Sequence, residues 1–484
     1  MEWIIVVLYC VALLAIFLFS LGQLHLTWIY TRPTSAKSKD FDEAYEPLVT
    51  VQLPIYNERY VAERLIDAVV KLDYPKDKLE IQILDDSNDE TVALIAQKVA
   101  EYQAQGFDIQ QIQREDRKGF KAGALAFGLK ICKGEYTAIF DSDFLPNPDF
   151  IKRTIGYFAN EKVGMVQTRW GHVNKDYSML TEMQAFGLDA HFTVEQGGRN
   201  RSGSFMNFNG TAGIWRKACV LDAGGWSADT LTEDLDLSYR AQLRGWQFQF
   251  DESVESPAEL PVEMSAIKSQ QYRWNKGAAE TAKKNLLNVF RAKVSLKTKI
   301  HAAMHLLNSS VFVLLLTASV LSIPMLYIKA ANGNLQWLFN LGSLFLIGFF
   351  SIAAFYFVGL KRIAPTHTKR LFLRKFPLFL SFSMGFALHN AIAVMEGYLG
   401  FKSPFVRTPK FNITKKTEGW TSNQYIKPKL TWGTIFEGLL CAYFVWGIFS
   451  AWLLNDYGLI LFHVMLAIGF GVIFYHSLKH IKNA

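Results

Sequence analysis

Cysteine is scarce in this chain of 484 residues, and the few cysteines form no recognisable pattern. They are Cys10, Cys132, Cys219 and Cys441. No two of them have the spacing of a metal site or of a disulfide framework. The cysteines therefore predict neither a cysteine metal site nor a disulfide framework, which fits a chain that folds in a reducing compartment.

Acidic residues are too few to balance the basic ones, which leaves a formal net charge of +8. Such an excess can indicate nucleic-acid binding. Here many basic residues fall in one short loop beside apolar segments, at Lys361, Arg362, Lys369, Arg370, Arg374 and Lys375. Anionic lipid headgroups are the simpler partner for this loop, so we expect contact with membrane lipids and not with nucleic acid.

Half of the residues are hydrophobic, and they gather toward the two ends of the chain. Residues 4–29 form an apolar run that is long enough to cross a bilayer. A signal peptide is the alternative, but no basic residue precedes the run. Arg32, Lys37 and Lys39 follow it, and the positive-inside rule places them in the cytoplasm. We therefore predict an N-terminal transmembrane helix over residues 1–30.

Four later apolar runs predict further membrane spans: 303–329, 335–359, 433–454 and 457–476. Another run, 376–400, contains His389, Asn390 and Glu396. We predict that it lies in the interface or re-enters the membrane, because the basic loop 401–431 then stays in the cytoplasm. If the run spans the membrane instead, the loop falls on the outside.

A polar middle, residues 45–280, separates the apolar ends, and an amphipathic segment that we expect at the membrane interface follows it at 281–300. Short β-branched runs alternate there with helical stretches, at 48–53, 61–71, 79–84, 90–103 and 136–140. This alternation predicts a Rossmann-like α/β domain with a mostly parallel sheet. Ligands of such sheets bind outside the carboxyl ends of the strands, where four aspartates fall. These are Asp85, Asp86, Asp141 and Asp143.

Asp141 and Asp143 flank one serine directly after an apolar strand. Two carboxylates in this arrangement can address one divalent cation, and their hard oxygen atoms suit Mg²⁺ or Mn²⁺. Such an ion would bridge the diphosphate of a sugar nucleotide. An isolated Asp-x-Asp triplet is also common in surface turns, so the motif needs support from others.

Two further motifs each allow a structural and a functional interpretation. The Thr-Glu-Asp motif at 232–234 starts an amphipathic helix, so Thr232 could cap it, or Asp234 could be the general base that deprotonates an acceptor hydroxyl. The Gln-x-x-Arg-Trp motif at 270–274 could anchor the chain beside a membrane. Alternatively, Arg273 could neutralise a departing diphosphate.

Polar turns follow the first two predicted strands, at residues 54–58 and 85–87, and Lys121 lies near the start of a helix. Proline, asparagine, aspartate and serine all favour turns, so these residues could be structural. The lysine could meet a phosphate at the helix start or could simply be solvated.

In their order along the chain, Asp-Asp, Asp-x-Asp, Thr-Glu-Asp and Gln-x-x-Arg-Trp resemble the processive family 2 glycosyltransferases, which include the cellulose, chitin, hyaluronan and mannan synthases. The sequence is most similar to the plant cellulose-synthase-like group that makes (gluco)mannan. The supporting stretches are residues 166–170, 191–196, 208–213 and 259–261.

The resemblance implies a GT-A type fold, an inverting mechanism and dependence on Mg²⁺ or Mn²⁺. It implies a donor site of Pro54, Tyr56, Glu58, Asp85, Asp86, Lys121 and Asp141. It assigns the metal to Asp141 and Asp143, the general base to Asp234, and stabilisation of the leaving group to Arg273. It implies an acceptor site of Phe208, Asn209, Gly210, Thr211, Gln270 and Trp274.

Residues 405–410 resemble the gating loop of cellulose synthase, with Phe405, Thr408 and Lys410 at matching positions and Arg407 in place of a valine. A gating loop must reach the cytoplasmic active site, which agrees with the interfacial prediction for 376–400. The alternative is a basic loop that rests on lipid headgroups.

These resemblances imply transfer of hexose from GDP-mannose or UDP-glucose to a growing β-linked mannan, glucomannan or glucan, and movement of that product across the membrane. A non-processive enzyme that makes a glycolipid is the alternative, and a transporter or scaffold with a degenerate catalytic domain is weaker. Because a channel made by so few helices would be narrow, we expect a second copy or an accessory subunit to help form it. The membrane would be the inner membrane in a bacterium or the Golgi in a plant-like cell.

Overall fold

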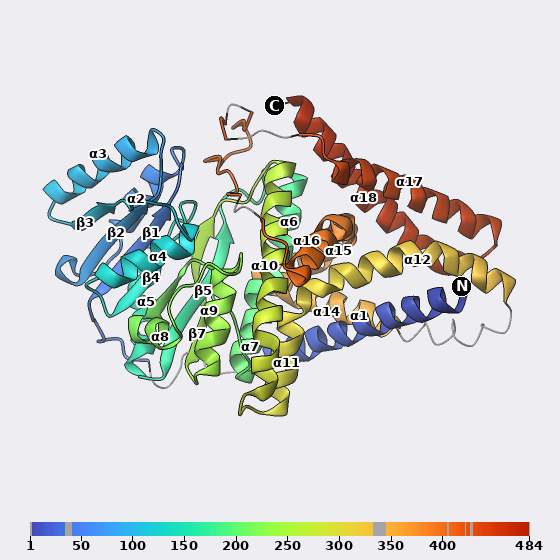
Figure 1. Cartoon of the computed structure of the whole chain (residues 1–484), viewed down its shortest axis with the longest axis horizontal. Coiled ribbons are helices and arrows are strands. Elements are labelled where there is room, and N and C mark those ends of the chain that lie inside the picture. The colour runs from blue at the N-terminus through green and yellow to red at the C-terminus, as the bar shows by residue number, and fades with distance from the viewer. Residues whose placement is uncertain are drawn as a thin grey trace.

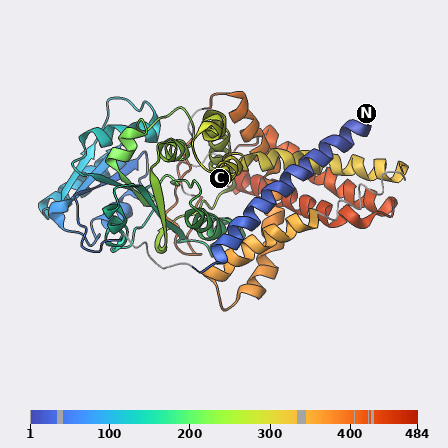
Figure 2. The ribbon, with the colours of Figure 1, turned by 90° about the horizontal axis from the view of Figure 1, so that it is seen from below.

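The structure, a computed structural model, describes residues 2–33, 41–332, 345–403, 406–421, 423–425 and 429–483. An α/β domain lies at one end of the molecule, and long apolar helices extend from it to the other end (Figure 1). The two views of the ribbon agree on this division (Figure 2). The predictions for Lys37, Lys39, Phe405 and residues 335–344 fall outside the described residues.

Seven strands form one sheet in the described part of the chain, in the order β3-β2-β1-β4-β6-β5-β7. They are β1 (Val49–Ile55), β2 (Leu79–Asp85), β3 (Asp108–Ile112), β4 (Tyr136–Ile139), β5 (Val163–His172), β6 (Gly213–Arg216) and β7 (Gln247–Ala258). Only β6 runs antiparallel to its neighbours. The predicted strands 48–53, 79–84 and 136–140 correspond to β1, β2 and β4, so the predicted mostly parallel sheet is confirmed.

Helices cover both faces of the sheet, which explains why nearly every residue of β1, β2 and β4 is buried, polar ones included. One face packs against α2 (Ala62–Val69), α3 (Thr91–Ala104) and α5 (Phe150–Thr154). The other packs against α4 (Phe120–Ile131), α8 (Lys217–Asp222) and α9 (Glu233–Leu243). Leu53 and Ile66 are fully buried in the first core, and Leu125 and Trp215 in the second. The polar residues at the strand ends therefore sit on a rigid, close-packed support.

Two groups of helices connect the sheet to the rest of the molecule. α6 (Met179–Ala190), a π-helical turn (His191–Glu195) and α7 (Gln196–Ser202) follow one another without a break between β5 and β6. α10 (Met264–Arg291) follows β7, and α11 (Leu296–Leu306) comes next. In Figure 1, α6, α7 and α10 stand between the sheet and the apolar helices.

Five helices in the described residues are long and apolar enough to cross a membrane. They comprise α1 (Glu2–Thr31), α12 (Val311–Ala331), α14 (Phe345–Ile363), α17 (Trp432–Leu453) and α18 (Ile460–Asn483). Each coincides with a predicted span, although α12 begins later than residue 303. α15 (Thr368–Gly385) and α16 (Ala387–Leu399) form a pair bent by 49°, which has the length and composition of a broken span or a re-entrant segment.

The amphipathic helix predicted at 281–300 is not a separate element, and this prediction is wrong. Its first half belongs to α10, whose buried Ala279, Ala282 and Val289 continue a single apolar face past residue 280. The chain then leaves the helix, and Ser295 starts α11 by accepting a hydrogen bond from the backbone N–H of Thr298. A new N-cap, and not a change in hydropathy, sets this boundary.

The segment after α16 returns to the α/β domain. Buried Glu259, directly after β7, accepts backbone hydrogen bonds from Phe411, Asn412 and Ile413. Arg64 on α2 forms an ion pair with the same carboxylate at 2.8 Å. Residues 411–413 of the loop after α16 are thereby held at the end of β7.

Candidate active site

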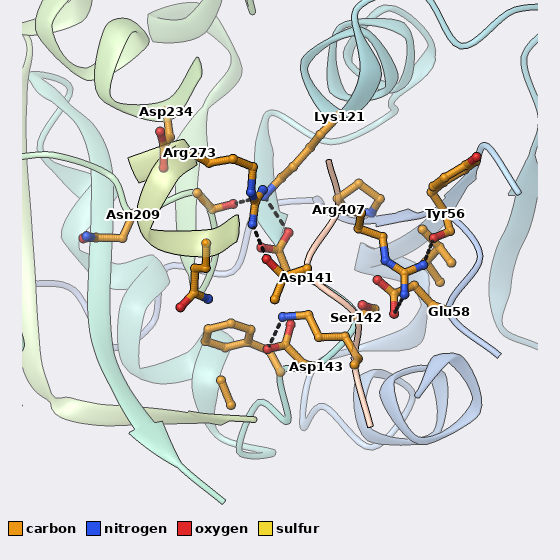
Figure 3. Close-up of a pocket in the computed structure, with 18 of the residues that line it drawn as sticks. Tyr56, Glu58, Lys121, Asp141, Ser142, Asp143, Asn209, Asp234, Arg273 and Arg407 are labelled. Atoms are coloured by element: carbon orange, nitrogen blue, oxygen red, sulfur yellow. Dashed lines mark hydrogen bonds and ion pairs between the residues drawn. The ribbon is translucent and has the colours of Figure 1, made fainter. Parts of the chain in front are cut away.

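A cavity of about 180 Å³ lies at the carboxyl ends of the strands. Its walls come from the residues that follow β1, β2 and β4, from the starts of α4 and α9, from α10 and from residues 407–410. Figure 3 shows side chains that follow β1 and β4 converging on one space with others from α4, α9, α10 and the loop at Arg407. The parallel sheet predicted from the sequence places the ligand at this same edge.

Asp141 and Asp143 follow β4 and face two lysines from opposite parts of the chain. Lys121 Nζ lies 2.5 Å from Asp141 Oδ1, and Lys410 Nζ lies 2.8 Å from Asp143 Oδ2. The hydroxyl of Thr211 accepts the backbone N–H of Asp141. Burial opposes the charge of Lys121, but the carboxylate of Asp141 outweighs it and raises the pKa of Lys121. Each of the two carboxylates therefore has a lysine as its counter-charge.

These carboxylates also fit a divalent cation. Asp143 is only 3% exposed, and its Oδ1 has no hydrogen-bond partner among the described residues. Within that same part of the chain, no group of three or more histidine, cysteine or acidic residues could hold a metal ion. Two carboxylates alone suit Mg²⁺ or Mn²⁺ only if a phosphate-bearing ligand supplies further oxygen atoms.

Asp234 lies at the start of α9, on the opposite side of Figure 3 from Tyr56. Burial, followed by the neighbouring charge of Glu233, raises the pKa of Asp234 above its usual range. Gly210 has a φ of +82°, and a Cβ at this glycine would lie 2.9 Å from Asp234 Oδ2. The glycine thus allows the backbone to approach the carboxylate closely. A buried carboxyl with a raised pKa suits a general base.

Thr232 does not cap α9, so this structural interpretation of the motif is wrong. Its side chain accepts no hydrogen bond from the first turn of the helix and instead lies 3.2 Å from the hydroxyl of Thr281 on α10. Packing of α10 against this segment, with Gly277 in contact with Thr232, draws the hydroxyl away from the helix end.

Gln270, Arg273 and Trp274 all line the cavity from the first half of α10. Arg273 donates to the hydroxyl of Thr408 at 2.8 Å. A guanidinium group keeps its charge at any ordinary pH, so this wall of the cavity carries a permanent positive charge.

Residues 407–410 enter the cavity from the loop after α16. Arg407 lies 3.2 Å from the buried carboxylate of Glu58 and donates to the carbonyl groups of Tyr56 and Asn57. Burial raises the pKa of Glu58 to about 7, although Arg407 and Lys410 oppose this rise. The loop therefore supplies counter-charges for the acidic residues of the site.

Three residues predicted for the site do not border the cavity. Phe208 is fully buried and packs against Trp215 and Trp226 in the core of the domain, because the apolar ring turns inward from the loop. Thr211 is fully buried and positions Asp141. The side chain of Asp85 accepts hydrogen bonds from Ser87 and Gln111 and so shapes the loop behind the site.

The other predicted residues within the described part line one cavity together: Pro54, Tyr56, Glu58, Asp86, Lys121, Asp141, Asp143, Asn209, Gly210, Asp234, Gln270, Arg273, Trp274, Arg407, Thr408 and Lys410. The sequence reasoning missed Arg117, which stacks on Tyr56 at 3.2 Å, and Arg114, which pairs with Asp86. In the sequence, only their position a few residues before Lys121 could have indicated that these arginines lie near the site.

A second cavity, of about 230 Å³, adjoins the first one and shares Leu188, Gln270 and Trp274 with it. Aromatic side chains from α14, α15 and the residue before α16 line it, at Tyr356, Phe379, Phe382 and Phe386. Asn390 also borders it, fully buried, and neither polar atom of its side chain has a partner among the described residues. The site thus continues toward the apolar helices.

The α/β domain is similar in sequence to known proteins. Residues 47–277 match the family model described as "Glycosyltransferase like family 2". A similar relative is glucomannan 4-beta-mannosyltransferase 1 from Oryza sativa subsp. japonica, 44% identical over 261 residues, which are 53% of this chain and 50% of the relative. Glucomannan 4-beta-mannosyltransferase 2 from Arabidopsis thaliana is 44% identical over 252 residues, 51% of this chain and 47% of its own length. The chain matches about half the length of these curated relatives.

Among solved structures, the chain is similar to the mannosyltransferase PcManGT from Pyrobaculum calidifontis in complex with GDP-Man and Mn²⁺. The TM-score is 0.54 at 19% identity, and the match covers 76% of this chain and 100% of that one. The likeness confirms the predicted GT-A type fold.

Proposed function

We propose that this chain, whose residues 47–277 form a family 2 glycosyltransferase domain, transfers hexose from a nucleotide-sugar to the end of a growing β-linked polysaccharide. One observation carries the proposal: a single cavity brings the Asp141–Asp143 pair, Lys121 and Arg273 together with a general base, Asp234. The pair and the cations suit a sugar diphosphate, and the base suits a hydroxyl nucleophile.

Transfer with inversion needs one base and an in-line approach of the acceptor. Asp234 removes the proton of the acceptor hydroxyl as its oxygen bonds to C1 of the donor sugar. The bond between C1 and the diphosphate oxygen breaks on the opposite side, and the nucleoside diphosphate leaves with the electron pair. Lys121 and Arg273 stabilise the charge that develops on it.

Asp141 and Asp143 would hold a Mg²⁺ or Mn²⁺ ion, which would add positive charge against the donor diphosphate when bound. The chemistry of the two carboxylates and the unpartnered Oδ1 of Asp143 support this assignment. Lys410 would then have to exchange its ion pair with Asp143 for one with the ligand.

The plant relatives favour a mannosyl donor, so GDP-mannose is our first candidate and UDP-glucose the second. The second cavity supports a polymer product, because aromatic side chains such as Phe379 and Phe386 offer stacking surfaces for sugar rings beyond Trp274. Movement of the product across the membrane along this cavity is part of the proposal, as is the assistance of a second copy or an accessory subunit.

The experiment uses the full chain in lipid with Mn²⁺ or Mg²⁺ and offers radiolabelled GDP-mannose and UDP-glucose separately. Products are sized and then digested with β-mannanase or β-glucanase, and Asp234→Asn protein is the control. We expect a long product from one donor that one enzyme digests. A single short lipid-linked product would contradict the polymerase and indicate a glycolipid-forming enzyme.

We also propose that the α15–α16 pair does not cross the membrane and that the catalytic domain is cytosolic. The contacts of Glu259 with residues 411–413 support this, since a loop on the other side of the membrane could not make them. A cysteine at exposed Lys416, in a background without native cysteines, should resist impermeant thiol reagents in intact cells. Labelling by such a reagent would contradict this topology, whereas labelling only after permeabilisation would support it.

A further inference from the structure

Asn209 borders the cavity on the side of Asp234 (Figure 3). Its carboxamide has two partners behind the cavity wall, both from the continuous helical segment that follows β5. Its Oδ1 accepts from Gln196 Nε2 at 2.7 Å, and its Nδ2 lies 3.0 Å from His191 Nε2. The next residue is Gly210, against which Asp234 packs.

The orientation of this carboxamide follows from the neighbouring backbone. Gln196 Nε2 also donates to the carbonyl group of Asn207 at 3.0 Å, and a carbonyl oxygen can only accept. The atom of Asn209 that faces Gln196 must therefore be the oxygen. The amide nitrogen of Asn209 then faces His191, so His191 Nε2 must be an acceptor without a proton.

The tautomer of His191 is set from its other side. With Nε2 unprotonated, the ring proton is on Nδ1, which lies 2.9 Å from Glu195 Oε2 and donates to it. Arg199 binds the second oxygen of Glu195 at 3.0 Å. Burial would raise the pKa of Glu195, but the hydrogen bond from His191 and the charge of Arg199 hold it well below its usual range.

The backbone at this point is unusual as well. His191 and Glu195 are the first and last residues of the π-helical turn between α6 and α7. Such turns are rare and are found frequently at functional sites. The turn places a histidine with one defined tautomer behind a residue of the cavity wall.

We propose that His191 is a positioning residue that fixes the carboxamide of Asn209 for binding a hydroxyl group of the acceptor sugar. Fixed in this way, Asn209 keeps one N–H and one lone pair without a partner among the described residues, which matches a hydroxyl that both donates and accepts. The inference rests on the proposed function and deepens it, because it assigns the Asn209 side of the cavity to the acceptor saccharide.

The test compares full-length wild type, His191→Phe and His191→Gln in lipid, with a soluble β-linked oligosaccharide acceptor at varied concentration. We expect His191→Phe to raise the acceptor KM about tenfold, as the loss of one neutral hydrogen bond allows, while the donor KM and nucleotide binding stay unchanged. Glutamine can accept from Asn209 through its amide oxygen, so His191→Gln should restore most of the acceptor affinity.

His305→Phe is the matched control. His305 is another partly buried histidine of this region, but its ring bonds to Tyr239, which is not part of the cavity wall. If His191→Phe fails to fold, as judged by its melting temperature, Gln196→Leu removes the other partner of Asn209 and should have the same effect on acceptor KM.

An unchanged acceptor KM in His191→Phe or in Gln196→Leu, with active wild type, would overturn this inference and leave the proposed function standing. Equal rises in acceptor and donor KM, or the same change in His305→Phe, would show a merely structural role and would also overturn it. Wild-type protein that transfers to no saccharide acceptor would overturn the proposed function and this inference with it.

Discussion

Two groups of charged residues in the cavity, one beside the sheet and one on the loop after α16, are held in different ways. Asp141 and Asp143 directly follow β4 in the close-packed sheet. Arg407 and Lys410 belong to the loop after α16, whose described stretch 406–421 contains no helix or strand and contacts the domain at Glu259, Glu58 and Asp143. Both sets meet in one cavity, so a rigid half of the site faces a half that a few polar contacts position.

This difference suggests a division of labour. Groups that must keep a fixed geometry for chemistry lie on the sheet, and groups that must exchange partners when a ligand enters lie on the loop. Substitutions on the sheet side should therefore abolish the reaction, and substitutions on the loop side should change affinities. The predictions below test that division, beginning with the largest expected effect.

Asp234→Asn should lower the turnover number about 10³-fold, because the variant cannot take the proton of the acceptor hydroxyl. Binding of GDP or UDP, measured by isothermal titration calorimetry, should be nearly unchanged. Loss of nucleotide binding in a folded protein would contradict the role of base and would place Asp234 in the donor site.

Asp141→Asn combined with Asp143→Asn should lower transfer about a hundredfold and remove its dependence on added Mn²⁺ or Mg²⁺. Chelation of the metal from wild type should cause a similar loss, and chelation should have no further effect on the double variant. If a chelator still inhibits the double variant, the metal is held elsewhere.

Lys410→Met should bind Mn²⁺ about fivefold more tightly in the absence of donor, because Asp143 loses a competing positive charge worth ~1 kcal/mol. Lys415→Met is the matched control, since this lysine is exposed on the same loop. Equal Mn²⁺ affinities in wild type and Lys410→Met would show that the loop does not compete for the metal carboxylate.

Glu233→Gln should move the acid limb of the pH profile of kcat/KM to lower pH. Burial and the charge of Glu233 both raise the pKa of Asp234, which acts as a base only when deprotonated, so activity rises as pH increases through that pKa. Removing the charge of Glu233 leaves burial as the main cause and lowers the pKa. If the acid limb of the kcat/KM profile lies at the same pH in the variant and in wild type, Glu233 carries no charge in that pH range.

Glu259→Gln should have the smallest effect on transfer but should free the loop. A glutamine cannot accept all the backbone N–H groups of residues 411–413, so trypsin should cut at Lys415 and Lys416 several-fold faster. Glu418→Gln is the control, since Glu418 accepts from Thr414 and Lys415 within the loop itself. Equal proteolysis of both variants would show that Glu259 is not the anchor.

Much of the fold and part of the site could be predicted from the sequence. Apolar runs that end in aspartate or proline predicted β1, β2 and β4, and the parallel connection then brought Asp86, Asp141 and Asp143 to one edge of the sheet. Hydropathy likewise predicted the helices that could span a membrane, because a bilayer requires about 20 consecutive apolar residues.

The tertiary structure alone decided which neighbours of a motif reach the cavity. The side chain of Phe208 is buried in the core, whereas Asn209 borders the cavity, although the resemblance assigns both residues to the acceptor site. Packing of α10 drew the Thr232 hydroxyl away from its capping position, and α10 ends at Arg291, nine residues before the predicted boundary at 300.

The sequence by itself determined the elements and the chemistry at their ends, because apolar periodicity and turn residues act over a few positions along the chain. It did not determine that Arg407 would pair with Glu58, that Lys410 would pair with Asp143, or that a π-helical turn would orient Asn209. Only the tertiary structure decided these contacts, because each joins segments whose approach depends on how the whole chain packs.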